Sequence, residues 1–304
     1  MKKISTRIVV TVLICSMVMS IIVGATSIIR SRSVIEKEAR ENLHMTQQVY
    51  ADNINKEINI YERVVNDTYQ IVNGTIDITR LSEENYLENY SNNILSPIML
   101  GIEEEIDKSG GIYIVFDSKY TGRTEGFWIG VDENLNKISG IPTNIAGIPE
   151  DDPSVGFYYD SLRAGKASWG EYYTNDANSN VVSYSTPLVI DGQTIGMIGM
   201  DMLTGEIENM INDIKVYDTG YAFLLNGNFD YILHPHIPVT SNLRTLEEGR
   251  YNELADEIER EGIGLTDFEY NNEKRIMSYS KLDDGKILFL TIPVNEIFKE
   301  MVRS

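Results

Sequence analysis

The first pattern along the chain is a continuous apolar segment close to the N-terminus. Residues 8–29 carry no charge, whereas basic residues flank both ends of this segment. A helix of about 20 apolar residues spans the hydrocarbon core of a membrane, and a cleavable signal peptide has a shorter apolar region of about 7–15 residues. We therefore expect a retained transmembrane helix at 8–29, although Val23-Gly24-Ala25 is similar to a signal-peptide cleavage site.

This segment also sets the expected location of the rest of the chain. Because basic residues flank both of its ends, the positive-inside rule gives little guidance on orientation. A short N-terminal tail is the part that most easily stays inside. We therefore expect residues 1–7 to be a cytoplasmic tail and residues 30–304 to lie outside the cytoplasm, in a protein that crosses the cell membrane once.

A helical period follows the apolar segment. Residues 33–72 contain neither proline nor glycine. Apolar side chains recur there at spacings of 3, 4 or 7, at Leu43, Tyr50, Ile54, Ile58, Tyr61, Val65 and Tyr69. This stripe is typical of a long amphipathic helix, which we assign to residues 30–74 and end at Asn73-Gly74. The stripe suits packing along the chain's own domain and also a seam between two copies, so we expect a homodimer that pairs through this stalk helix.

The next part of the chain alternates strands and turns. Asp191-Gly192 lies between two apolar runs, and Asp-Gly supplies the positive φ angles of a tight hairpin turn. Asp152-Pro153-Ser154 is expected to open a short helix that ends near Gly165, because proline suits the first turn of a helix. Aromatic and β-branched content predicts strands at 111–117, 126–132, 169–174, 181–190 and 194–201.

The second half repeats this pattern more weakly. A helix is expected at 203–214, and hairpins are expected at 220–225 with 229–233, joined by Asn226-Gly227, and at 275–282 with 287–292. Ser183-Tyr184-Ser185 precedes one Asp-Gly turn and Ser278-Tyr279-Ser280 precedes another. A repeat of about 90 residues indicates two tandem modules. We predict an α+β fold with antiparallel sheets in modules at 75–202 and 203–298, and the start of an exit helix at 299–304.

Composition and charge exclude several function classes. The net charge is −20, which opposes binding to nucleic acid. Cys15 is the single cysteine and lies in the apolar segment, so disulfides and cysteine-based zinc sites are not expected. His234-Pro235-His236 is interpreted as a turn after a strand. Because no nucleophile elbow, phosphate loop or paired-histidine motif is present, we expect no catalytic residues, no metal, no cofactor and no enzyme activity.

Aromatic residues concentrate between residues 128 and 201, where both tryptophans of the chain lie. Ligand pockets are mostly apolar and aromatic with a few polar groups, and the Asp201 carboxylate could pair with an ammonium group among aromatic faces. The alternative is that the aromatic residues form ordinary core and that Asp201 caps the helix starting near Leu203. The candidate ligand-binding residues are Asp201, Tyr173, Tyr158, Phe157, Trp128, Trp169 and Tyr184.

The stretch from Val155 to Asp201 resembles the double Cache sensor domains of bacterial chemoreceptors, histidine kinases and diguanylate cyclases. The resemblance rests on an ordered set of motifs and covers Ser33 to about Arg303. In the first module the motif residues are Phe157-Tyr158, Gly165-Lys166, Trp169, Tyr173, Pro187, Gly196, Gly199 and Asp201. In the second module they are Thr219-Gly220-Tyr221-Ala222-Phe223 and Leu233-His234-Pro235.

This resemblance implies a long N-terminal helix, two PAS-like modules, and a small ligand in the membrane-distal one. In the subgroup that binds amino acids, an arginine holds the ligand carboxylate and an aspartate holds its amino group. Asp201 and Tyr173 match that pattern, whereas Val155 stands at the arginine position and Phe157 replaces a tryptophan. We therefore expect an amine, an amino-acid-like compound or another metabolite as the ligand.

The family usually continues through a second membrane helix into an output domain for chemotaxis, phosphorylation or cyclic-di-GMP synthesis. This chain stops at Ser304. We expect it to be the sensing part of a signal-transducing receptor whose output lies beyond this chain. A membrane-anchored binding protein that acts through a partner is the alternative, and an exported hydrolase is a third reading.

Overall fold

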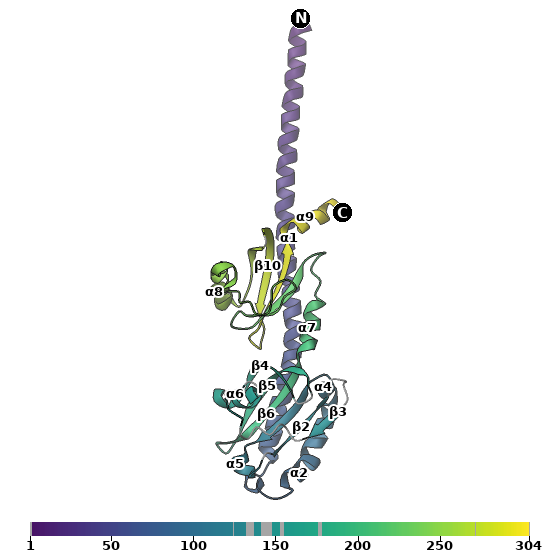
Figure 1. The fold of residues 1–304 in the computed structure, drawn as a ribbon. Helices are drawn as coiled ribbons and strands as arrows, with labels where there is room; N and C mark the ends of the chain where they lie inside the picture. Colours follow the sequence, from purple (N-terminus) through teal and green to yellow (C-terminus); the bar gives the residue numbers. More distant parts are fainter. Residues whose placement is uncertain are drawn as a thin grey trace. The chain divides into compact units, whose positions relative to one another are not determined.

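The computed structural model describes residues 2–123, 125–131, 137–140, 148–152, 155–175, 178–270 and 272–303. The chain forms two compact units (Figure 1). The first module consists of residues 52–211, and the second module consists of residues 1–51 together with residues 212–304. Each module is described here by itself.

Helix α1 (Lys2–Thr75) is continuous from the apolar segment to Gly74 and contributes to both modules. The predicted transmembrane and stalk helices are therefore one helix, because no helix-breaking residue separates them. By length and composition its apolar stretch can cross a membrane, and no side chain of that stretch is buried in the protein. Further along, the predicted stripe is buried at Leu43, Ile54, Ile58 and Val65.

The first module contains an antiparallel sheet of β1 (Gly111–Phe116), β2 (Glu125–Val131), β3 (Lys137–Gly140), β4 (Ser168–Thr174), β5 (Asn180–Ile190) and β6 (Gln193–Leu203). The strand order is β3-β2-β1-β6-β5-β4. β5 and β6 form the predicted hairpin, and Asp191 and Gly192 have the expected positive φ angles of 49° and 76°. Asp132, Pro153 and Ser154, which were assigned to a strand and a helix start, lie outside the described residues.

Helices cover both faces of this sheet. α1 packs on one face, where the Tyr61 and Trp169 ring centroids are 6.3 Å apart. α6 (Gly156–Ala164) packs on the other face, where Tyr158 contacts a core cluster with Val115 and Met197. The remaining helical segments are η1 (Ile78–Arg80), α2 (Tyr86–Tyr90), the π-helical η2 (Ser91–Leu95), α3 (Ser96–Gly101), α4 (Glu103–Asp107), α5 (Ser118–Thr121) and α7 (Thr204–Asn212).

The second module contains an antiparallel sheet of β7 (Tyr221–Leu225), β8 (Tyr231–Leu233), β9 (Ile263–Tyr270), β10 (Glu273–Lys281) and β11 (Ile287–Pro293). The strand order is β8-β7-β11-β10-β9. Its other elements are η4 (Leu246–Gly249), α8 (Asn252–Glu261) and α9 (Val294–Arg303). α8 packs on one face over a core that includes Phe223, Tyr279 and Phe289. The sequence patterns did not reveal α8 or the edge strand β9.

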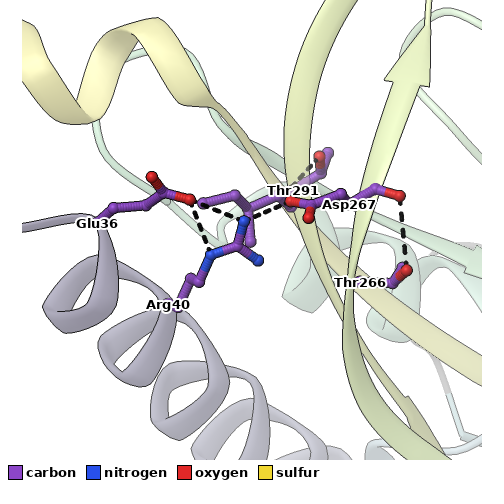
Figure 2. Close-up of polar contacts among 6 residues, drawn as sticks. Glu36, Arg40, Thr266, Asp267 and Thr291 are labelled. Atoms are coloured by element: carbon purple, nitrogen blue, oxygen red, sulfur yellow. Dashed lines mark hydrogen bonds and ion pairs between the residues drawn. The ribbon is translucent and has the colours of Figure 1, made fainter. Parts of the chain in front are cut away.

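α1 packs on the opposite face of this second sheet. Gln47 Nε2 donates to the Leu288 carbonyl at 2.8 Å, and His44 Nδ1 lies 3.2 Å from the Ser278 hydroxyl. Figure 2 shows a third contact, in which Arg40 of α1 bonds both Glu36 of the same helix and Asp267 of β9. Polar contacts therefore join α1 to three strands of the second sheet.

Two details of the second module differ from the sequence interpretation. The Asn226-Gly227 turn is not a two-residue primed turn, because the Asn226 side chain accepts hydrogen bonds from the amides of Asn228 and Asp230 and the positive φ falls on Phe229. The two Ser-Tyr-Ser motifs are also not equivalent. Tyr184 lies on the α1 face of its sheet beside Trp169, whereas Tyr279 faces away from α1. The tandem arrangement of two antiparallel sheets is confirmed. The two Ser-Tyr-Ser motifs, however, do not occupy equivalent positions, because their tyrosines point to different faces of their sheets.

Candidate functional site

A buried carboxylate lies at the centre of the candidate site. Asp201, on β6, is 1% exposed. Its Oδ1 accepts hydrogen bonds from the Tyr173 hydroxyl at 2.8 Å and the Ser183 hydroxyl at 2.5 Å, and its Oδ2 accepts one from Asn175 Nδ2 at 3.2 Å. A buried charge needs such donors to offset the loss of hydration. The alternative role of Asp201 as a cap of α7 does not account for these three contacts, which join it to a cluster of polar side chains.

Strand register brings these groups together. Ser183 of β5 and Gly111 of β1 are the direct cross-strand neighbours of Asp201, so their positions share its face of the sheet. A β-bulge between Trp169 and Tyr172 shifts the register of β4. Bulges change the direction in which later side chains point, and Tyr173 consequently reaches the same face as Asp201.

Aromatic rings line the region next to Asp201. Phe157 of α6 stacks on Tyr173 with centroids 5.5 Å apart and an interplanar angle of 17°. Tyr113 of β1 meets Phe157 edge to face at 5.4 Å. Gly199 lies opposite Tyr113, and a Cβ at this glycine would lie 2.5 Å from the Tyr113 hydroxyl oxygen. The glycine therefore makes room for the Tyr113 ring.

Tyr113 belongs to the candidate site, although the sequence interpretation did not include it. It is 2% exposed, and its hydroxyl lies within interaction range of Ser183, Tyr173 and Asp201. Tyr113 therefore adds a buried hydroxyl to the polar cluster around Asp201. The tyrosine lies within the apolar run Gly-Ile-Tyr-Ile-Val-Phe, where it looks like an ordinary core residue. Gly199 leaves space for its ring, but this relation is visible only once the pairing of β1 with β6 is known.

Burial keeps the phenols of this site protonated. The pKa values of Tyr173 and Tyr113 are both raised well above 10, first by burial and then by the negative charge of Asp201. Both hydroxyls are therefore hydrogen-bond donors at neutral pH. A carboxylate surrounded by neutral donors and aromatic faces is suited to a cationic group, because ring faces and the carboxylate both attract positive charge.

The other predicted residues are distributed over the module. Trp169 and Tyr184 pack together on the α1 face, where Trp169 Nε1 donates to Glu62 Oε1 at 2.8 Å. They therefore lie on the opposite face of the sheet from Asp201. Tyr158 lies on the Asp201 face beside Met197, which is four residues and roughly 14 Å along the strand from Asp201. Trp128 is the cross-strand neighbour of Tyr113 and packs against the core cluster that contains Tyr113, Tyr158 and Met197.

A separate cleft of about 860 Å³ lies in the same module. It is bordered by β2, β3 and the segment from α2 to α4, and its lining includes Met99, Phe127 and Trp128 but not Asp201. Of the predicted site residues, only Trp128 contributes to this cleft. Within the described part of the chain, no group of three or more histidine, cysteine, aspartate or glutamate side chains is arranged to hold a metal ion.

Two chemotaxis proteins are similar to parts of this sequence. The methyl-accepting chemotaxis protein TlpB of Bacillus subtilis (strain 168) is 30% identical over 146 residues, which are 47% of this chain and 21% of TlpB. The methyl-accepting chemotaxis protein PctB of Pseudomonas aeruginosa is 24% identical over 166 residues, which are 53% of this chain and 23% of PctB. The chain thus spans only about a quarter or less of the length of these relatives.

Solved sensory domains share the fold. The sensory domain of the Campylobacter jejuni chemoreceptor Tlp3 (CcmL) with isoleucine bound has a TM-score of 0.61 at 14% identity, over 88% of this chain and 97% of that domain. A methyl-accepting chemotaxis protein X has a TM-score of 0.60 at 14% identity, over 85% and 99% of the two chains. A family model for the Cache domain, dCache_1, matches residues 31–301. The chain belongs to this Cache domain family of sensor domains.

Proposed function

We propose that this chain is the extracytoplasmic sensing part of a transmembrane signalling receptor, and that its first module binds a small amine-bearing metabolite at Asp201. The observation that carries the ligand class is the buried Asp201 carboxylate, which faces aromatic rings and neutral donors. On this proposal the chain has no catalytic activity of its own. A membrane-anchored binding protein that acts through a partner uses the same site and is the alternative.

The residues around the site favour an amine without a tightly held carboxylate. Val155 is fully buried and apolar at the position where the amino-acid-binding subgroup has arginine. A carboxylate is held best by the two parallel hydrogen bonds of a guanidinium, and Val155 supplies none. The Tlp3 sensory domain has been solved with isoleucine bound, and the ammonium group of an amino acid is the chemical group that we propose for the Asp201 site.

The membrane location rests on α1. Its apolar stretch is long enough to cross a bilayer and exposes its side chains, as a lipid-facing helix does. We propose that residues 8–29 cross the membrane and that residues 30–304 lie outside. Ligand binding would then reach the membrane as a shift in the population of two arrangements of α1.

Pairing through α1 is supported by apolar side chains that the modules leave uncovered. Val34, Met45 and Val49 are exposed and are spaced by 11 and 4 residues, so they share one face of the helix. We propose that this face contacts the same face of a second copy, because parallel helices leaving one membrane bury apolar residues against each other in this way.

The ligand proposal is tested by thermal shift on the full chain in lipid nanodiscs. The probes are propylamine, ethanolamine, phenethylamine and L-isoleucine, with propionamide as an uncharged control. We expect at least one amine to raise the melting temperature, because a ligand that binds only the folded state stabilises it. Asp201→Asn should weaken that amine at least about 30-fold, since it removes a buried charge partner.

Asp191→Asn is the matched control, because it removes a carboxylate from an exposed turn of the same module and asparagine tolerates the positive φ there. This variant should respond to amines as the wild type does. Equal stabilisation of wild type and Asp201→Asn by an amine would place the amine elsewhere. No response to any amine would count against the proposed ligand class.

A further inference from the structure

The second module contains a buried guanidinium that is only partly bonded. Arg275 of β10 is 6% exposed. Its Nε donates to the Thr291 hydroxyl at 3.1 Å, and its Nη1 pairs with Glu273 at 2.6 Å. Its Nη2 is buried and has no partner among the described residues. A buried charged donor without an acceptor is costly, so this atom marks a place where an acceptor is missing.

Aromatic and histidine rings surround this guanidinium. The Arg275 Cζ atom lies 4.8 Å from the centroid of the Tyr221 ring. The same ring meets His234 and His236 at centroid distances of 5.3 and 5.2 Å. Phe268 and Tyr270 of β9 are half-buried and, like Tyr221, pack against the core of the second module. The region around Arg275 therefore combines a cation with apolar ring surface.

His234 adds a second hydrogen-bond donor. Its Nδ1 accepts from the backbone amides of His236 at 3.0 Å and Ile237 at 2.9 Å. A ring nitrogen that accepts cannot carry the proton, so Nε2 does. Burial, followed by the charges of His236 and Arg275, lowers the pKa of His234 to about 3. The imidazole is therefore neutral at pH 7 and offers one N–H group from Nε2.

We propose that the second module contains a binding site for a small carboxylate with a short apolar tail, held by the Arg275 guanidinium and the His234 Nε2–H group. An arginine recognises a carboxylate through planar hydrogen bonds, and the rings of Tyr221, Phe268 and Tyr270 provide apolar surface for the tail. The site lies in a different module from Asp201 and has the opposite charge preference, so it does not rest on the proposed amine site.

Glu273 competes with such a ligand from within the chain. Its side chain is 42% exposed, and its carboxylate pairs with Nη1 of Arg275. An incoming carboxylate meets the free Nη2 and gains the second nitrogen when Glu273 turns toward solvent. Removing the Glu273 charge should therefore strengthen carboxylate binding, whereas removing the Arg275 charge should weaken it. These opposite effects distinguish a ligand site from an ion pair that only stabilises the fold.

Histidine NMR on the full chain in detergent micelles tests the site. The chain has three histidines, and selective ¹⁵N labelling makes each a separate reporter. Propionate is the probe and propionamide is its uncharged control, at constant ionic strength. We expect propionate to shift the His234 and His236 signals saturably and to leave His44 unchanged, because His44 bonds Ser278 on the α1 face. Propionamide should shift none of them.

Three variants complete the test. Arg275→Gln should weaken propionate binding at least about tenfold, as loss of a charged hydrogen-bond pair does. Lys274→Gln removes a neighbouring cation that is exposed, and it should bind propionate as the wild type does. Glu273→Gln should bind propionate more tightly.

The proposal fails if propionate shifts neither His234 nor His236, or if propionamide shifts them equally. It also fails if a folded Arg275→Gln binds as tightly as the wild type. Should Arg275→Gln not fold, Glu273→Gln decides the matter: tighter propionate binding supports the site, and unchanged or weaker binding overturns it.

Discussion

Single residues in this protein show how burial selects protonation states. Tyr113 and Tyr173 stay protonated beside Asp201 because burial and the aspartate charge both oppose the phenolate. His234 stays neutral because burial and two backbone amides leave no room for a second ring proton. Burial therefore selects the neutral form of a side chain in both modules, in the phenols beside Asp201 and in the imidazole near Arg275.

The histidine makes acid stability a testable property. The pKa of His234 is about 3 in the folded state and 6.5 as the ordinary value, so between these values the unfolded chain binds one more proton at this position. The free energy of unfolding therefore falls as pH is lowered from about 6.5 to about 3. His234→Asn keeps an acceptor for the two amides and removes the titration. Its urea midpoint should decrease less than that of the wild type across this pH range, and parallel curves would contradict the assignment.

Residue types in the site were only partly predictable. Asp201 and Tyr173 stood out because a carboxylate and a phenol near strand ends match a family pattern. Tyr113, Ser183 and Asn175 carried no such signal, since tyrosine and serine inside apolar runs are normal core residues. Their role depends on which residue lies across the neighbouring strand, and this is a property of pairing and not of local sequence.

At the scale of elements, the bulge in β4 divides the predicted aromatic set. Trp169 before the bulge faces α1, and Tyr173 after it faces Asp201. An unbroken strand would keep Trp169 and Tyr173 on one face, because they are four residues apart and side chains alternate with a period of two. One extra residue thus separates a contact with the long helix from a contact with the candidate ligand site.

A glycine substitution tests the packing between β1 and β6. A Cβ at Gly199 would lie 2.5 Å from both Cζ and the hydroxyl oxygen of Tyr113, so Gly199→Ala forces the ring to move. We expect a loss of about 1–3 kcal/mol in the free energy of unfolding and weaker amine binding. Gly205→Ala in α7 has open space around the new Cβ and should be neutral or slightly stabilising. Urea denaturation measures both, and equal stability of the two variants would argue against this packing.

Polar contacts between α1 and the second sheet are the other feature at this scale. Arg40 bonds Asp267 of β9, and Gln47 bonds a backbone carbonyl of β11 (Figure 2 shows the Arg40 contacts). The helical stripe predicted this helix, but the pattern of apolar residues did not indicate which polar residues would contact the sheet. Such contacts depend on the position of the helix along the sheet, which packing decides.

At the scale of the whole molecule, one helix joins the apolar segment to both modules. The uncovered apolar positions of α1 make pairing testable. In a Cys15→Ser background, Met45→Cys should form a disulfide-linked dimer in native membranes under mild oxidation, because its side chain is exposed on the proposed seam. Arg260→Cys on α8 is the exposed control and should remain monomeric on gels. Failure of Met45→Cys to cross-link, or equal linking at both positions, would refute pairing through this face.

The sequence by itself determined the features that depend on local order. The apolar run, the 3.6-residue period of α1, the alternation in the strands and the Asp191-Gly192 turn all arise between neighbours in the chain, and the antiparallel α+β modules follow from them. Tertiary structure alone decided the features that depend on register between distant segments. It brought Tyr113 and Ser183 to Asp201, moved Trp169 and Tyr184 to the opposite face, and left one Arg275 nitrogen without a partner among the described residues. Pairing between strands and packing against helices set the direction of each of these side chains.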